Sequence, residues 1–406
     1  MKYDFDEVIP RMGTNSNKWE YFPVSGVRGK SDAADPARGE DQILPMWVAD
    51  MDFRCAQPII DAMTARVQHG IFGYTFAGDS YYQAVTDWYH RRHGWRAEAD
   101  WIVSISGVVP AINMLVRAII EPGDKVIIQP PVYHPFHDLG KNNGGEIVYN
   151  PLIERNGRYE MDFEDLTAKA ADPKATVLVL CNPHNPAGMC WSEADLRRLY
   201  EICGNNGVKV ISDEIHCDLI LPGKTFTSVG KLGEEIFRNT VICTAPSKTF
   251  SLAGLHLSSI VIPDPDLRAR YSKVLAGTGL SSINPMSLVA LETAYREGED
   301  WLNQALDYVA ANYAFTADYV ASNLPKLKLM EPDGTYMVWV DFRGLGMDDK
   351  TLSQFISERV KLALNDGYTF GPGGSGFERM NLACPRSILE RALDRLKREI
   401  DRLEIQ

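Results

Sequence analysis

The chain has 406 residues, and 45% of them are hydrophobic, which is enough to bury a core larger than one domain usually holds. Its formal net charge of -12, with no run of lysine or arginine, makes nucleic acid and anionic lipid surfaces poor partners. The opening residues, MKYDFDEVIPRMG, lack the apolar stretch of a signal peptide, and no later segment is apolar over a bilayer-spanning length. We therefore expect a soluble, cytoplasmic protein with no nucleic acid and no membrane as partner.

Five apolar, β-branched runs in the middle of the chain predict strands that are covered on both faces. They occupy residues 125–131, 175–183, 208–215, 240–248 and 257–263. Between them, residues 192–207 have helical spacing, with Ser192 as the candidate N-cap. Strands that alternate with helices predict an α/β fold with a mainly parallel sheet flanked by helices.

The pattern changes after about residue 290. A long helical stretch at 301–324 is followed by a strand-like segment, GTYMVWVDF, and by a last helix that we expect to begin at Ser387, where SILE has the capping-box form. These elements predict a second, smaller α+β lobe. We expect the N-terminal segment through LPMWVAD to cross to that lobe rather than join the central sheet.

Neither a disulfide framework nor a metal site is expected. The cysteines are odd in number, contain no CxxC pair and are predicted to be reduced thiols. Two histidine pairs, His90 with His93 and His134 with His137, have no third ligand at a recognised spacing.

Polar residues follow three of the predicted strands, at the edge of a parallel sheet where ligands bind. Asn182 and Asn185 follow the apolar stretch ATVLVL, Asp213 and His216 follow VKVI, and Lys248 follows TVIC. A lysine at the mouth of a buried strand loses hydration, which favours its nucleophilic free amine, although a lysine whose charge stays in water is the commoner case. Taken singly each signal is weak, because strand-end asparagines and aspartates often cap turns and helices.

A candidate anion site precedes the first of these strands. In WIVSISGVVPAINMLVRAI, the residues Ser106, Gly107, Val108 and Val109 come before Pro110, a favourable first residue of a helix. Free backbone N–H groups and the positive end of a helix dipole at this junction would attract an anion.

Together these residues supply what pyridoxal 5'-phosphate requires. Lys248 offers an amine for its aldehyde, Asp213 a carboxylate for its ring nitrogen, and Asn185 a donor for its phenolic oxygen. The turn at residues 107–109, with the hydroxyl of Ser247, could hold the phosphate. Tyr133 could stack on the ring, although a tyrosine of the core remains an alternative.

The chain resembles fold-type I pyridoxal phosphate enzymes of the class I/II aminotransferase superfamily, through NPHNPAG, SDEIH and SKTFSLAGL in that order. The resemblance implies an aspartate-aminotransferase-like fold, with a large cofactor domain at 51–290 and a small domain built from residues 1–50 and 291–406. It also implies a homodimer with shared active sites, in which Tyr74 of GIFGYTF reaches the partner's cofactor phosphate. By the same resemblance, Arg386 of RMNLACPR grips the substrate carboxylate, with Arg379 as the next candidate.

Three phrases, LPMWVADMDF, SDEIHCDL and APSKTFSLAGLHLS, are similar to the cystathionine β-lyase-like (MalY/PatB) branch of that superfamily. His216 stands where many aminotransferases have a tyrosine, and His256 where many have a phosphate-binding arginine. On this resemblance Ala49 and Tyr133 are expected to contact substrate, and Asn182 and His216 the cofactor.

The resemblance implies a carbon–sulfur β-lyase that cleaves cystathionine or related cysteine S-conjugates to a thiol, pyruvate and ammonia. An aminotransferase of an L-amino acid shares the early steps and stays open as an alternative. A regulatory protein that binds the cofactor without turnover is a third possibility.

Overall fold

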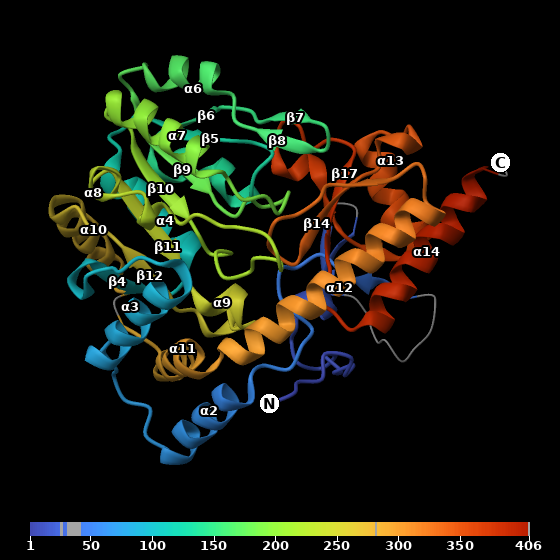
Figure 1. Ribbon diagram of the computed structural model, residues 1–406, viewed down its shortest axis with the longest axis horizontal. Helices are drawn as coiled ribbons and strands as arrows, with labels where there is room; N and C mark the ends of the chain where they lie inside the picture. The colour runs from blue at the N-terminus through green and yellow to red at the C-terminus, as the bar shows by residue number, and fades with distance from the viewer. Residues whose placement is uncertain (25–26, 31–41, 281, 405–406) are drawn as a thin grey trace.

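The computed structural model describes residues 1–24, 27–30, 42–280 and 282–404. Parts of both expected domains, at residues 25–26, 31–41, 281 and 405–406, lie outside the described residues. Two bodies stand side by side in Figure 1, one around a large sheet and one around a smaller sheet, and the long helix α12 (Glu299–Asn323) runs from one to the other. No helix in the described part of the chain combines the length and the apolar character that a membrane crossing needs.

The large sheet has seven strands in the order β4-β12-β11-β10-β9-β5-β6. Their bounds are β4 Ile102–Ile105, β12 Ser258–Val261, β11 Thr240–Thr244, β10 Lys209–Asp213, β9 Ala175–Cys181, β5 Lys125–Ile128 and β6 Glu146–Tyr149. The prediction of a mainly parallel sheet is confirmed, and β12 alone of these strands runs antiparallel to its neighbours. The β11–β12 connection contains one short turn of helix, α9 (Pro246–Thr249), and a 3₁₀ turn, and not the full helix that usually returns the chain in a parallel crossover.

Helices cover both faces of this sheet, as the continuous apolar runs predict. Alternate residues of one strand therefore enter different cores: Val177 and Val179 of β9 pack with α4 (Val108–Ile119) and α10 (Pro265–Thr278), while Leu178 and Leu180 pack on the other side. That other side carries α2 Gln57–His69, α3 Asp79–His93, α6 Phe163–Ala170, α7 Glu193–Asn205 and α11 Pro285–Glu297. The predicted cap of α7 is confirmed, since the Ser192 side chain accepts a hydrogen bond from the Asp195 N–H.

The smaller sheet is antiparallel, with the order β13-β14-β17-β16. Its strands are β13 Lys328–Leu329, β14 Met337–Asp341, β17 Phe377–Asn381 and β16 Asn365–Asp366. The N-terminal segment does cross to this body, because β3 (Leu44–Pro45) pairs in parallel with β15 (Leu362–Ala363). We propose residues 51–290 as the large domain and residues 1–50 with 291–406 as the small one, a division that these two sheets support.

The last helix, α14, spans Arg386–Glu404 and begins one residue earlier than the capping-box pattern predicts. The carbonyl of Pro385 accepts the Ile388 and Leu389 N–H groups, so the first helical turn closes on Pro385. Ser387 therefore lies inside the helix rather than at its cap.

The remaining α-helices and strands are α1 Asn17–Glu20, β1 Tyr21–Val24, β2 Val27–Lys30, α5 Leu139–Asn143, β7 Ile153–Arg155, β8 Arg158–Glu160, α8 Glu234–Phe237 and α13 Asp349–Gln354.

A carboxyl pair, one member buried and the other partly buried, joins β16 to β17. Glu378 is buried, lies opposite Asp366 in the ladder, and leaves its Oε2 without a partner among the described groups. Burial raises the pKa of Glu378 well above its usual range, and that of Asp366 moves the same way, with Asp349 adding further negative charge. The folded state therefore keeps a proton that the unfolded chain releases at neutral pH, and stability falls as the pH rises through the folded pKa.

Glu378→Gln is expected to raise the free energy of unfolding by about 1 kcal/mol at pH 8, because the amide donates to Asp366 without taking up a proton. The gain should shrink at pH 5, where the wild-type pair is already protonated. Denaturant unfolding at both pH values measures this, with the exposed Glu390→Gln on α14 as control. A loss of stability that is equal at both pH values would contradict the shared proton.

Candidate active site

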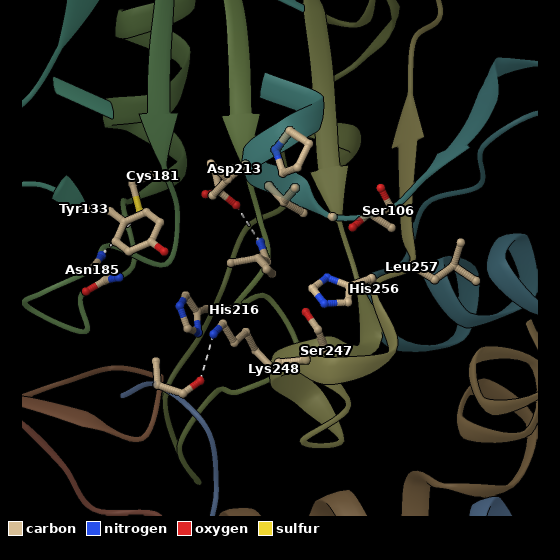
Figure 2. Close-up of a pocket in the computed structure, with 18 residues that line it drawn as sticks. Ser106, Tyr133, Cys181, Asn185, Asp213, His216, Ser247, Lys248, His256 and Leu257 are labelled. Carbon is tan, nitrogen blue, oxygen red and sulfur yellow. Dashed lines mark hydrogen bonds between the residues drawn. The ribbon is translucent and has the colours of Figure 1, made fainter. Parts of the chain in front are cut away.

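A cavity of about 260 Å³ lies at the carboxyl ends of β9, β10 and β11 (Figure 2). It gathers most of the residues that the sequence singled out. Those that line it are Ala49, Gly107, Val108, Val109, Tyr133, Asn185, Asp213, His216, Ser247 and Lys248. Residues from loops more than 100 positions apart in the chain therefore face one small volume.

Lys248 projects from α9, one turn beyond the end of β11. Its Nζ donates a hydrogen bond to the Ala49 carbonyl at 2.7 Å, drawn as a dashed line in Figure 2. This bond joins the large body to the N-terminal segment. Burial, followed by the positive charge of Arg379, lowers the pKa of Lys248 to about 8. The free amine that acts as base and nucleophile is thus far more populated near neutral pH than in an ordinary lysine.

Asp213 ends β10 and is buried at the base of the cavity. Its Oδ1 accepts the Ile215 N–H at 3.1 Å, and no cation among the described residues pairs with it. Burial raises the pKa of Asp213 to about 7. A buried carboxylate in this state is stabilised by a cationic ligand atom, which is what a protonated ring nitrogen provides.

Asn185 is positioned by two contacts. Its backbone N–H donates to Cys181 Sγ at 3.3 Å, and its side-chain Oδ1 accepts from Arg379 Nη1 at 2.8 Å. Because the oxygen is engaged by an arginine, the amide N–H₂ is left to donate to a ligand.

Two rings complete this side of the cavity. Tyr133, which also lines it, has its pKa raised by burial, so its hydroxyl stays neutral. His216 is buried and its Nδ1 has no partner in the described structure, while burial lowers its pKa well below the usual range. Tyr133 and His216 are therefore both uncharged when they contact a ligand in the cavity.

The far end of the cavity suits an anion. Gly107 precedes α4 with a φ of 127°, a conformation that side-chain-bearing residues rarely adopt, and the first N–H groups of α4 lie beyond it. Ser106, Ser247 and Ser258 line the same region, together with His256. Backbone donors, hydroxyls and the α4 dipole are the groups that bind phosphate.

This donor set fits pyridoxal 5'-phosphate. Lys248 and Asp213 can face its aldehyde and ring nitrogen, and the α4 N-terminus its phosphate. Two observations are left unexplained by a purely structural role: the buried Asp213 carboxylate has no cationic partner among the described residues, and the pKa of Lys248 is lowered.

The expectation for Arg386 needs correction. Its Nε donates to Asn312 Oδ1 at 2.8 Å and its guanidinium lies 4.5 Å from the ring centre of Phe315, so it packs against α12 and does not line the cavity. It is the first residue of α14, and the packing of α14 on α12 points its side chain that way.

Arg379, the other candidate, lies behind the cavity wall rather than in the cavity lining. It is buried on β17, donates to the Trp47 carbonyl at 3.0 Å and to Asn365 Oδ1 at 2.6 Å, and reaches Asn185 on the cavity wall. Burial lowers its pKa to about 10, and within the described residues it pairs with no carboxylate. A buried arginine without an anion is suited to receive one from a substrate.

Two other expected contacts are not found within this chain. Asn182 is fully buried, but its side chain donates to the Thr227 carbonyl and accepts from the Trp191 N–H, so it braces the loop after β9 outside the cavity. Tyr74 is fully exposed on the segment between α2 and α3 and does not line the cavity of its own chain.

The sequence also missed Tyr336, whose hydroxyl donates to the Ala49 carbonyl at 2.8 Å, and Cys181 on the cavity wall. Ala49 therefore accepts from Tyr336 and from Lys248 together. The strand-like GTYMVWVDF contains Tyr336, but nothing in that pattern indicates a partner 287 positions away.

A second polar cluster lies apart from the cavity lining. His93, Cys217 and Asp218 place one potential ligand atom each within 4.8 Å of one another. Asp218 already accepts from His93 at 2.7 Å, and from Trp88 and Thr249. Its oxygens are thus engaged by protein donors, which favours a structural role for this cluster.

Comparison with known proteins places the chain in a family. It is 43% identical to cystathionine beta-lyase PatB of Bacillus subtilis over 394 residues, 97% of this chain and 99% of PatB. It superposes on a PLP-bound putative aminotransferase from Clostridium difficile 630 with a TM-score of 0.92 and 41% identity, covering 98% of this chain and 100% of that one. Cystalysin from Treponema denticola, which contains a pyridoxal 5'-phosphate cofactor, gives a TM-score of 0.93 at 35% identity, covering 99% and 100%. Residues 50–396 match the family model for aminotransferase class I and II, and the chain belongs to that family.

Proposed function

We propose that this protein is a pyridoxal phosphate-dependent carbon–sulfur β-lyase that cleaves cystathionine or related cysteine S-conjugates. The single observation that carries the proposal is the convergence of Lys248, Asp213 and Arg379 on one cavity and its walls, in a chain 43% identical to a cystathionine beta-lyase over nearly its whole length. The overall reaction consumes one water and releases one thiol, one pyruvate and one ammonia.

The cofactor would be held along the whole cavity. Lys248 would carry its aldehyde carbon, Asp213 would keep its ring nitrogen protonated, and Asn185 would donate to its phenolic oxygen. The N-terminus of α4, with Ser106 and Ser247, would receive its phosphate. When bound, the cofactor supplies an electron sink for the carbanion at the substrate Cα.

The chain's own residues then do three things. Arg379 binds the substrate α-carboxylate and thereby fixes the direction of the Cα–H bond. The Lys248 amine, with a pKa of about 8, accepts the α-proton and keeps it near the sulfur that departs. The Ala49 carbonyl, which holds Lys248 Nζ at 2.7 Å, keeps the amine in the cavity when it is free.

Product analysis tests this function. The purified holoenzyme given cystathionine should release pyruvate and a thiol in equal amounts, without any keto-acid acceptor. Strict dependence on a keto acid would instead favour an aminotransferase, the activity named for the similar Clostridium difficile protein. Cofactor binding without turnover of cystathionine, cystine or an amino-acid panel would favour the regulatory alternative.

We also propose that the protein is a homodimer with shared active sites. The segment between α2 and α3 exposes four large apolar side chains, each more than half accessible, which is unusual for a lone chain. They are Ile71, Phe72, Tyr74 and Phe76. A second copy that covers this segment would bring Tyr74 toward the phosphate end of the partner's cavity.

Tyr74→Phe is expected to weaken cofactor retention about tenfold, because one hydrogen bond to phosphate is lost. Mixing it with Lys248→Ala subunits tests the geometry, because one site of a mixed dimer carries both defects and the other carries neither. Activity should therefore reappear on subunit exchange. If mixed dimers form and activity stays at the sum of the two parents, Tyr74 serves its own chain or none.

A cytoplasmic location completes the proposal. All seven cysteines are free thiols, and five of them are buried. Reduced, buried cysteines are the usual state in a reducing compartment.

A further inference from the structure

A second cavity lies at the opposite edge of the large sheet. It surrounds Lys209, the first residue of β10, whereas Asp213 at the other end of that strand lines the active site. Its volume, about 890 Å³, exceeds the 260 Å³ of the active-site cavity. In Figure 1 the helices α8 and α10 beside it lie at the left, away from the α9 that carries Lys248. Nothing in the proposed reaction uses this cavity.

Aromatic rings form one wall of it. Trp101 and Phe237 are half-buried, with ring centres 5.7 Å apart, and the buried Trp95 lies 5.6 Å from Phe237. A Cβ on Gly230 would stand 2.4 Å from the Trp95 ring, so only glycine lets this segment close on the tryptophan. The Trp95 Nε1 is buried and has no hydrogen-bond partner among the described atoms. An apolar wall of mutually tilted aromatic rings can pack against an aromatic ring of a ligand, face to face or edge to face.

The rim of the same cavity is basic although the chain as a whole carries a formal charge of -12. Its charged lining comprises the cations Arg96, Lys209, Lys231 and Arg238 and the anions Glu234 and Asp264. Lys209 is pinned by Asp264 Oδ2 and by the Arg238 carbonyl, each at 3.1 Å. Lys231 and Arg238, both exposed, make no ion pair within the described structure. Two unpaired cations therefore face a cavity that has an aromatic wall.

We propose that this cavity, called here the β10 cleft, binds a small molecule that joins a flat aromatic ring to an anionic group, of the nucleoside phosphate class. The ring packs against the wall that Trp101 and Phe237 form, and the phosphates pair with Lys231 and Arg238. The two features are needed together, because exposed lysines alone bind phosphate weakly and an apolar wall alone gives no preference for charge. This site is independent of the cofactor and of the proposed reaction.

Calorimetric titration of the holoenzyme with ADP tests the proposal, because the occupied active site removes the competing phosphate site. We expect saturable binding, at least tenfold weaker with adenosine, which lacks the anion, and with pyrophosphate, which lacks the ring. Equal binding of pyrophosphate alone would overturn the proposal, since it would indicate a non-specific anion site, and so would an absence of heat with ADP.

Two matched variants locate the binding. Lys231→Gln with Arg238→Gln removes the two unpaired cations of the β10 cleft and should weaken ADP at least tenfold. Arg270→Gln with Lys273→Gln removes the same charge from exposed positions of α10 outside the cleft lining and should leave ADP affinity unchanged. If both double variants bind ADP with equal affinity, ADP does not bind in the β10 cleft, and the assignment is overturned. Unchanged lyase activity in both shows that each is folded.

Trp101→Ala tests the ring wall separately. It should weaken ADP about tenfold while leaving pyrophosphate binding at its low level, because only the ring contact is lost. An ADP affinity equal to wild type in this variant would show that no ring packs on Trp101, and the ring part of the proposal would be wrong.

Discussion

Lys248→Ala is expected to reduce lyase turnover by at least about a thousandfold, because the same amine holds the cofactor and accepts the α-proton. The absorption band of covalently bound pyridoxal phosphate should vanish with it. The fold should persist, since the lysine makes one hydrogen bond, to the Ala49 carbonyl, and pairs with no carboxylate within ion-pair distance in the described chain. Turnover and the absorption spectrum of the purified variant check this.

An exposed lysine gives the matched control. Lys273→Ala on α10 removes a lysine side chain from an exposed position that does not line the cavity, and it should keep both turnover and the absorption band. Near-wild-type turnover of Lys248→Ala would show that another group takes the proton. Loss of both signals in the control would point to a general effect on folding instead.

Arg379→Lys is expected to lower kcat/KM for every α-amino-acid substrate by about a hundredfold or more, while cofactor absorption stays unchanged. Lysine keeps the positive charge but loses the two-pronged geometry that grips a carboxylate. It also lacks the nitrogens that reach Asn185, Trp47 and Asn365 together, so part of the loss reflects poorer positioning. Steady-state kinetics with cystathionine measure the effect.

Arg386→Lys is the comparison that decides between the two arginines. Its guanidinium contacts Asn312 and lies over Phe315, away from the cavity, so the expected change in kcat/KM is less than about threefold. A large fall in Arg386→Lys with a small one in Arg379→Lys would reverse the assignment. That outcome would require the small lobe to turn α14 toward the cavity on substrate binding.

The sequence by itself determined the central sheet and the groups at its edge. Each strand is a short apolar run that ends in polar residues, and parallel strands must present those ends at one edge. For this reason Lys248, Asp213 and Asn185 could be expected to converge without knowledge of any long-range contact. The turn at Gly107 is equally local, because a glycine before an apolar helix predicts free N–H groups wherever the helix packs.

The direction of β12 was not predictable from its own residues. The run at 257–263 has the same apolar pattern as its neighbours, yet β12 is antiparallel to them. The 13 residues between Thr244 and Ser258 are enough for a parallel crossover, but they form only short helical turns instead of a full helix. The apolar pattern of a strand does not specify its direction.

The tertiary structure alone decided which arginine contacts the cavity wall. RMNLACPR contains Arg379 and Arg386, and both follow plausible turns in the sequence. Alternate residues of β17 point to opposite sides of the small sheet, so Glu378 pairs with Asp366 while Arg379 points to Asn185. Which of these sides meets the large domain depends on how α12 and α14 pack, and the same is true of Tyr336 on Ala49. A local pattern determines on which face of its helix or strand a side chain lies. The residue that it contacts is determined by the packing of elements that can be hundreds of residues apart.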